Sequence, residues 1–200
     1  MGLLIKTSRF TWFLPLALAL SCAQNGGAVL VDAQWNLSCP AESAVECGSW
    51  ATNSCIGAGS QRAIVGEHGQ AECGDRIIAI CESVARTGGT EDITLEANVD
   101  RGGGSSPRFA FELSVKIDSS DDSVEFCNVT IIEDDVPYDI GDCGQEMPTL
   151  QQPCQLTDID TGGNEVSFNL QCRSLFSSVT GLALDVDSAA PIRFANCTGF

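Results

Sequence analysis

Much of the chain alternates between apolar and polar residues, and a period of two is the pattern of half-buried β-strands. Apolar side chains occupy every second position in residues 93–99 and again in residues 109–117. The segment between them, Arg101–Pro107 (RGGGSSP), has the composition of a turn. One face of each strand is apolar and the other polar, as in an antiparallel sheet with one wetted side. The two segments are therefore predicted to form a hairpin.

The same alternation returns in four shorter segments, residues 127–131, 166–172, 182–186 and 192–194. Turn-forming clusters, Asp118–Asp122 and Asp160–Asn164, lie between segments of this kind. Arg76–Ala85 has helical spacing at some positions, but we assign it to a strand because strands flank it and residues 87–90 have the composition of a hairpin turn. About eight strands at roughly ten-residue spacing predict an all-β fold, an antiparallel β-sandwich.

Residues 34–81 differ from this pattern, because Gly, Ser and Ala are abundant there and the expected strands are short. We expect residues 1–22 to be an export signal and residues 23–200 to form a single cysteine-rich β-sandwich domain. The alternative is a cysteine-rich subdomain over residues 23–88 followed by a sandwich over residues 89–200.

Eleven cysteines indicate a disulfide framework. Leaving out Cys22, which cleavage or lipidation would remove from the pool, makes the number even, and so many disulfides belong in an oxidising compartment. The sequence has no C-x-x-C motif, so it signals neither a redox pair nor a zinc knuckle. The cysteines expected to form disulfides are Cys39, Cys47, Cys55, Cys73, Cys81, Cys127, Cys143, Cys154, Cys172 and Cys197.

Two segments, residues 127–143 and 154–172, each begin with Cys-x-apolar-Thr, pass through an acidic turn and end at a second cysteine. In a hairpin, the first residue of one strand lies opposite the last residue of the next. We therefore predict the bonds Cys127–Cys143 and Cys154–Cys172. The five cysteines from 39 to 81 are an odd number, so one of them must bond to the C-terminal half, with Cys197 the favoured partner.

The N-terminus has the features of an export signal. Residues 1–9 carry Lys6 and Arg9 and no acid, and an apolar stretch follows at Phe10–Leu20. That stretch is too short to span a bilayer, which takes about twenty apolar residues. Signal peptidase could cut after Ala23, because Ser21–Ala23 satisfies the small-x-small rule.

A second interpretation of the same segment rests on Ala19–Cys22 (ALSC), which resembles a bacterial lipobox. On this motif the chain resembles small cysteine-rich bacterial lipoproteins of unassigned function, although Ala19 stands where that family usually has Leu. The resemblance implies that Cys22 is the lipidated first residue of the mature chain and contacts the membrane through its acyl chains. It also implies that Ala23, next to the cysteine, directs the protein to the outer membrane.

Three Asn-x-Ser/Thr sequons, at Asn36, Asn128 and Asn196, would accept glycans in a eukaryotic secreted protein. Asn128 and Asn196 each adjoin a cysteine, which is an awkward position for a bulky glycan. Of the two origins we favour the bacterial one.

The formal net charge of −17, from 27 acidic and 10 basic residues, argues against a nucleic-acid partner, because phosphate backbones require basic patches. His68 is the only histidine, and the glycines around it indicate a loop. No G-x-S-x-G elbow accompanies it, so we predict that the protein is not an enzyme. Carboxylates are plentiful, and a secreted carboxylate-dependent hydrolase is therefore the alternative.

Calcium is the one cofactor that the sequence suggests. Asp158, Asp160 and Asn164 place oxygen ligands at spaced positions around two glycines, as calcium requires. The competing interpretation is an ordinary hairpin tip, in which the same residues supply the turn geometry. A second acidic group, Asp118, Asp121 and Asp122, is open to the same two interpretations.

Exposed aromatic side chains that could bind a glycan are few. After the signal, the amphipathic aromatics are Trp35, Trp50 and Tyr138, and we expect both tryptophans to fill core positions beside disulfides. These observations favour an exported, lipid-anchored, non-catalytic protein of the cell envelope or surface, structural or ligand-binding, with an unspecified protein or glycan partner. A calcium-dependent adhesion module and a freely secreted protein are the further alternatives.

Overall fold

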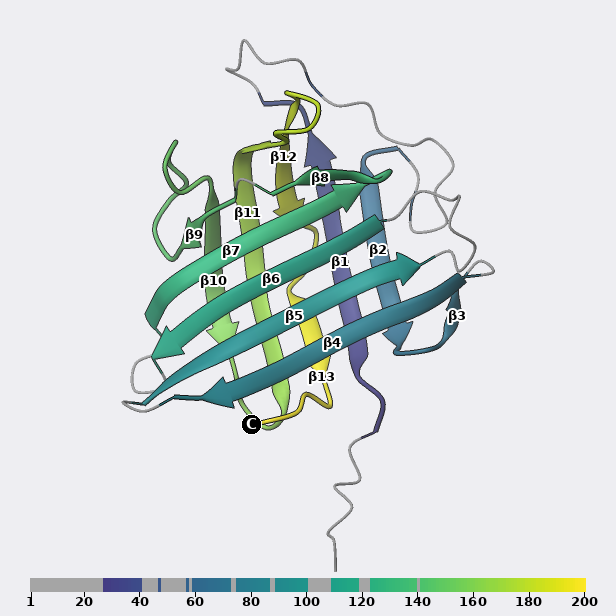
Figure 1. Ribbon diagram of the computed structural model, residues 1–200, viewed down its shortest axis with the longest axis vertical. Coiled ribbons are helices and arrows are strands. Elements are labelled where there is room, and N and C mark those ends of the chain that lie inside the picture. The colour runs from purple at the N-terminus through teal and green to yellow at the C-terminus, as the bar shows by residue number, and fades with distance from the viewer. Residues whose placement is uncertain are drawn as a thin grey trace, which may run out of the picture.

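The computed structural model describes residues 27–40, 47, 57, 59–72, 75–86, 89–100, 109–118, 123–139 and 141–200, and these form two β-sheets packed face to face (Figure 1). The predicted all-β, disulfide-stapled sandwich is confirmed. In Figure 1 the strands of the sheet in front cross those of the sheet behind at a large angle. Within the described ranges, no helix has the length and apolarity needed to cross a membrane.

The first sheet gathers strands from both ends of the chain. It consists of β1 (Leu30–Ser38), β2 (Gln61–Glu67), β9 (Cys143–Gly144), β10 (Cys154–Asp160), β11 (Glu165–Phe176), β12 (Ala183–Ser188) and β13 (Ile192–Ala195). β12 and β13 each pair antiparallel with β1 on one side and with β11 on the other. Together they therefore act as one strand that is interrupted at residues 189–191.

The second sheet is an antiparallel meander in chain order. It consists of β3 (Ala71–Glu72), β4 (Asp75–Ala85), β5 (Thr90–Asp100), β6 (Phe109–Asp118), β7 (Ser123–Glu133) and β8 (Val136–Tyr138). The predicted hairpin is confirmed as β5 and β6, and residues 76–85 form a strand as assigned. β4 and β5 pair over ten positions, so the alternative domain boundary at residue 88 would divide one continuous sheet.

The core lies between the sheets and is filled by the apolar positions of the alternating pattern. Phe111 sits at its centre, with ring centroids 6.3 Å from Trp35, 6.0 Å from Phe168 and 6.5 Å from Phe194. Trp35 fills a core position as expected, being 1% exposed, whereas Trp50 lies outside the described residues. Tyr138 is buried as well, so neither Trp35 nor Tyr138 is available to a ligand at the surface.

Four disulfides occur among the described residues, namely Cys39–Cys47, Cys81–Cys197, Cys127–Cys143 and Cys154–Cys172. Both predicted pairings are confirmed, and Cys197 bonds to one of the five N-terminal cysteines as expected. Cys22, Cys55 and Cys73 lie outside the described residues.

Hairpin geometry explains only one of the two predicted disulfides, and for the other it is wrong. Cys154 faces Cys172 across the β10–β11 hairpin, with their Cα atoms 3.9 Å apart, as the hairpin argument requires. Cys127 lies on β7 of the second sheet, however, while Cys143 lies on β9 of the first. The chain changes sheets between them, because the Gly141 carbonyl still accepts from Val129 N–H and Cys143 then pairs beside Cys154. This bond therefore joins the two sheets.

A buried ion pair also joins the sheets. Arg62 on β2 donates Nε–H to Glu133 Oε2 on β7 at 2.9 Å, and its Nη2 contacts Oε1 of the same carboxylate. The side chains are 0% and 3% exposed. Burial, followed by the nearby charge of Glu133, raises the pKa of Tyr138 above its ordinary value. A charged pair thus lies buried between the two sheets.

Candidate functional site

The lone histidine is engaged by the backbone. His68 follows β2 in a turn, and its Nδ1 lies 3.0 Å from the Ala79 carbonyl oxygen and 3.2 Å from the Ala79 nitrogen. Ala79 belongs to β4, beyond Asp75 and Arg76 where β3 pairs with that strand, and the imidazole contacts the β4 backbone there. Among the described residues, no Ser, Thr or Cys side chain hydrogen-bonds to His68, and the geometry offers no nucleophile–base pair at this position.

The residues predicted to bind calcium form the tip of the β10–β11 hairpin. The Asp158 carboxylate accepts from Asn169 Nδ2 at 2.7 Å, and that of Asp160 accepts from Gly162 N–H at 2.9 Å. Asp158 and Asn164 both adopt positive φ, at 52° and 64°, as turn residues of these types can. Across the described ranges, no three His, Cys, Asp or Glu side chains are placed to hold a metal ion. The hairpin thus accounts for these residues, and calcium binding stays a prediction.

The second acidic group is only partly described. Asp118 ends β6, at the edge of the described residues, while Asp121 and Asp122 lie outside them.

The interrupted strand creates the most distinctive feature of the first sheet. Gln171 pairs with Asp187 and Phe168 with Ile192, so three steps along β11 correspond to five along β12 and β13. The extra residues bulge out of the ladder, as in an enlarged β-bulge. Leu170 N–H donates to the Ser188 hydroxyl oxygen at 3.1 Å.

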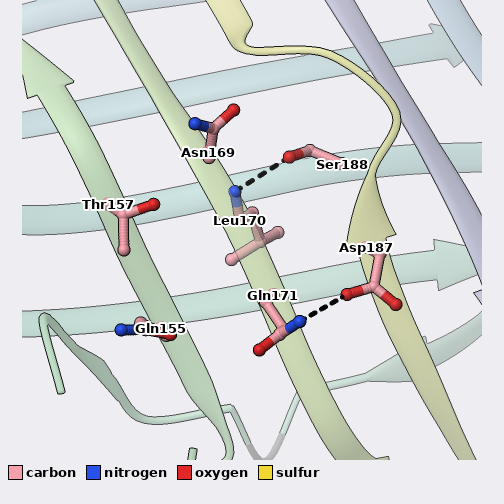
Figure 2. Close-up of a pocket in the computed structure, with 7 residues that line it drawn as sticks. All are labelled: Gln155, Thr157, Asn169, Leu170, Gln171, Asp187 and Ser188. Atoms are coloured by element: carbon pink, nitrogen blue, oxygen red, sulfur yellow. Dashed lines mark hydrogen bonds between the residues drawn. The ribbon is translucent and has the colours of Figure 1, made fainter. Parts of the chain in front are cut away.

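A polar groove of about 240 Å³ lies at this interruption (Figure 2). It spans three neighbouring strands, β10, β11 and β12, on the face of the sheet that points away from the core. The residues that line it are Gln155, Thr157, Asn169, Leu170, Gln171, Asp187 and Ser188. Apart from Leu170, every side chain in this set is polar, because inward and outward positions alternate along each strand.

The amide side chains of the groove are held in place by their nitrogens. Gln155 Nε2 donates to the Gln145 carbonyl at 2.9 Å, and Gln171 Nε2 donates to Asp187 at 3.0 Å. Asn169 Nδ2 is taken by Asp158, as described above. Each amide nitrogen keeps a second N–H beside its amide oxygen, so each side chain still has a donor and an acceptor for a ligand.

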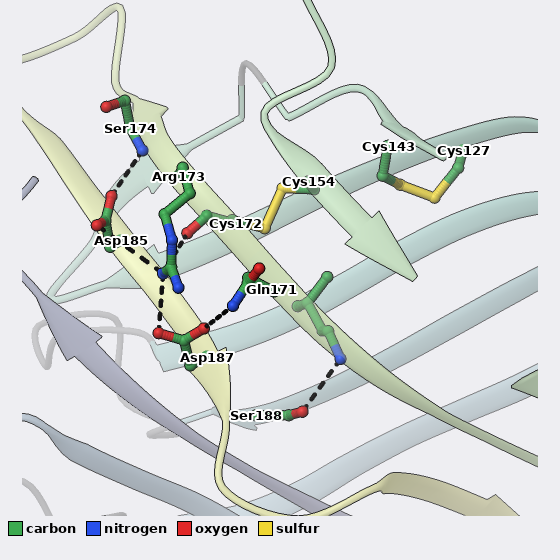
Figure 3. The surroundings of a disulfide bond; sticks show 11 residues. Cys127, Cys143, Cys154, Gln171, Cys172, Arg173, Ser174, Asp185, Asp187 and Ser188 are labelled. Atoms are coloured by element: carbon green, nitrogen blue, oxygen red, sulfur yellow. Dashed lines mark hydrogen bonds and ion pairs between the residues drawn. A yellow bond between two sulfur atoms is a disulfide. The ribbon is translucent and has the colours of Figure 1, made fainter. Parts of the chain in front are cut away.

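One arginine partly compensates two aspartates at one side of the groove (Figure 3). Arg173 Nη1 lies 2.8 Å from Asp187 Oδ2 and 3.9 Å from Asp185 Oδ2. The hydrogen bond to Asp187 raises the pKa of Arg173, with partial desolvation opposing it and the charges of both aspartates adding to it. Asp185 also accepts from Ser174 N–H at 2.7 Å. Asp187 is the one acidic residue that lines the groove.

Replacing Ser188 by alanine tests whether the interruption is held by its hydroxyl. Leu170 N–H would lose its acceptor in a partly buried position, so the free energy of unfolding is expected to fall by about 1 kcal/mol. Urea unfolding of Ser188→Ala against the parent protein measures this. Ser188→Thr, which keeps the hydroxyl, is the control. Equal stability of all three proteins would show that water or a neighbour replaces the hydroxyl at no cost.

A second prediction concerns Glu165 on the same face. Arg193 donates Nε–H to Glu165 Oε1 at 2.5 Å and Nη2–H to Oε2 at 2.6 Å, and these bonds lower the pKa of Glu165 despite partial desolvation. A carboxyl whose pKa is lower in the folded state stabilises the fold above its unfolded pKa, and this contribution is lost as pH falls through the folded pKa. The pair is largely exposed, so the effect is small. Glu165→Gln should be less stable than the parent at pH 7, and the difference should shrink as pH falls below the ordinary glutamate pKa of about 4.3. A difference independent of pH would contradict it.

The alternating pattern of the sequence does not reveal the groove. Its residues are the polar positions of the alternating strands, which were interpreted only as a solvated face. One signal was present, since Pro191 stands between two alternating segments that would otherwise form one strand.

No family model, curated protein or solved structure matches this chain. The fold and the groove are therefore the observations from which a function can be proposed.

Proposed function

We propose that the protein is an exported, non-catalytic binding protein of the cell envelope or surface, held there by a lipid on Cys22. The observation that carries the binding role is the polar groove, whose amide side chains are fixed in orientation by hydrogen bonds from their nitrogens. Because these side chains are already fixed, less conformational entropy is lost when a ligand binds.

Export is supported by the disulfides. Four of them occur in the described part of a chain of 200 residues, and such bonds persist in oxidising compartments. The position at which β1 begins suits a lipid anchor on Cys22. β1 begins at the lower end of the sandwich in Figure 1, and only a short segment separates Cys22 from Gly27. Five residues span at most about 17 Å, so an acyl anchor would hold the domain close to the membrane by this end.

The binding role is favoured over the hydrolase alternative by the same groove. Glycoside hydrolysis uses two carboxyl groups flanking the scissile bond, one of them in an apolar environment. Here one carboxylate lines the groove, and it is already bonded to Gln171 and Arg173. Activity on generic glycosidase or esterase substrates that disappears in Asp187→Asn would overturn the non-catalytic assignment.

Membrane fractionation combined with intact mass tests the anchor. The full-length gene is expressed in a bacterial host, with Cys22→Ala as the test variant. Cys39→Ala, which removes a cysteine from a disulfide, is the matched control. We expect the parent and Cys39→Ala in the membrane fraction with a mass beginning at Cys22 plus acyl chains, and Cys22→Ala in the soluble exported fraction. A parent mass beginning at Gln24 without lipid would make the protein freely secreted, and added hexoses on protein from its natural source would make it eukaryotic.

A further inference from the structure

We infer that the groove on the first sheet binds the hydroxyl groups of a neutral saccharide. The inference rests on the binding role proposed for this groove and is independent of the lipid anchor. It follows from which hydrogen-bonding groups the groove has already used and which it still offers.

The groove offers a cluster of hydrogen-bond acceptors. Gln155, Asn169 and Gln171 each donate through the amide nitrogen to a protein oxygen, and their amide oxygens have no partner among the described residues. Figure 2 shows the Gln155 nitrogen turned away from β11 and its oxygen turned toward it. A ligand that fits this lining must therefore present several donors close together.

The groove also offers donors, because each of the three amide nitrogens keeps a second N–H. The Ser188 hydroxyl oxygen accepts from Leu170, so its proton remains available to a ligand, and Thr157 adds a second hydroxyl. Sugar hydroxyls both donate and accept, so neighbouring hydroxyls on one ring match a lining of this kind. A peptide backbone offers one N–H and one C=O per residue, which uses fewer of the clustered acceptors.

The charge of the groove lining limits which ligands it favours. The Asp187 carboxylate is balanced by Arg173 at 2.8 Å, so the groove does not favour a cationic ligand strongly. The one charged side chain that lines the groove is the Asp187 carboxylate, which repels an anionic group of a ligand. A neutral ligand is therefore favoured over an acidic sugar or a phosphate.

The volume of the groove limits the size of the ligand and the affinity expected for it. The groove, at about 240 Å³, is smaller than the pockets of roughly 300–1,000 Å³ that enclose drug-sized ligands. It would therefore take one ring, with the rest of a glycan outside. No aromatic side chain lines it, so stacking adds nothing and a Kd of about 1 mM is expected for a monosaccharide. Many anchored copies on one surface would raise the avidity for a polymeric glycan.

The test is an NMR titration of the full chain as its soluble exported form, Cys22→Ala if the parent is lipidated. The probes are glucose, galactose and N-acetylglucosamine, added to about ten times a 1 mM Kd. We expect saturating shifts of the side-chain amide signals of Gln155, Asn169 and Gln171 with at least one of the three sugars. N-methylacetamide, an amide without hydroxyls, should leave these signals in place, and glucuronate should bind more weakly than glucose.

The variants Gln155→Met and Thr157→Val remove polar groups from the groove with little change of shape. Each should weaken sugar binding about three- to tenfold. Gln61→Met, at an exposed position of β2 in the same sheet and outside the groove, should bind like the parent. Absence of shifts with all three sugars, equal binding by the groove variants, or equal shifts with N-methylacetamide would overturn the inference. Membrane attachment through Cys22 is measured separately, by fractionation and intact mass. A negative titration therefore contradicts saccharide binding and leaves the proposal of a lipid-anchored protein standing.

Discussion

Replacement of Arg62 by methionine is expected to lower the free energy of unfolding by about 3–5 kcal/mol, because it leaves the Glu133 carboxylate buried without its partner. The guanidinium lies between the two sheets. Besides Glu133, it donates to the carbonyls of Gly59 and Gln61 at 2.8 Å each and stacks over the Phe109 ring, 5.7 Å from its centroid. With nearly all its donors engaged, the charge stays compensated in the apolar interior.

The double variant Arg62→Met/Glu133→Leu distinguishes a compensated charge from a net stabilising pair. Removing both charges eliminates their desolvation cost, and apolar replacements of buried ion pairs are often neutral or better. The double variant is therefore expected to be more stable than either Arg62→Met or Glu133→Leu alone. Urea unfolding midpoints and slopes of the parent, both single variants and the double variant measure this coupling.

A surface pair supplies the control. Lys116 and Glu125 pair on exposed positions of β6 and β7, with side chains 37% and 43% exposed. Lys116→Met should cost less than about 1 kcal/mol, because water screens the charges. If Arg62→Met costs no more than Lys116→Met, water reaches the interior pair and the site is not dry.

The pair illustrates what the alternating pattern conveys and what it leaves out. The pattern identified β5 and β6 because each has an unbroken run of apolar side chains on one face. It assigned no strand to residues 30–38, although Val31, Ala33, Trp35 and Leu37 alternate there, because the surrounding segment is rich in small residues and cysteines. Arg62 occupies an inward position of β2. A charged residue there interrupts the alternation of apolar and polar residues from which a strand is predicted.

Long-range pairing explains the other misses. The bond between Cys154 and Cys172 follows from local hairpin geometry, which is readable from the sequence. Cys127 and Cys143 were paired correctly, but nothing local shows that the chain moves from one sheet to the other at Gly141. The groove depends on the same kind of information, because it exists only where β10, β11 and β12 lie side by side and β12 is interrupted. Sequence periodicity predicts faces, and the pairing of distant strands decides which faces meet.

Loss of the Cys81–Cys197 disulfide is expected to destabilise the protein by about 4–5 kcal/mol, more than loss of any other disulfide in the described ranges. The two cysteines are 116 residues apart, so the bond restricts the unfolded chain far more than Cys39–Cys47, which closes a separation of 8. On the chain-entropy model the short bond contributes about 2–3 kcal/mol, and Cys154–Cys172, with a separation of 18, lies between them.

The folded state adds to this difference. Cys197 follows β13 of the first sheet and bonds to β4 at the edge of the second, so the bond fastens the C-terminus across the sandwich. Thr198 then donates its N–H to the Cys81 carbonyl at 3.0 Å and accepts from Ser83 N–H at 2.8 Å. These contacts cover part of an edge strand that would otherwise present unpaired backbone groups to another chain.

Paired alanine variants test the ranking, since replacing both cysteines avoids a free thiol. Cys81→Ala/Cys197→Ala, Cys154→Ala/Cys172→Ala and Cys39→Ala/Cys47→Ala are compared by urea unfolding, and their aggregation is followed by light scattering. The first variant should be the least stable and the one most prone to aggregate, because it alone loosens the covering of β4. A ranking with Cys39→Ala/Cys47→Ala as the least stable would contradict the entropic argument. Equal aggregation of all three would show that Thr198 stays on β4 without the bond, held by its backbone hydrogen bonds alone.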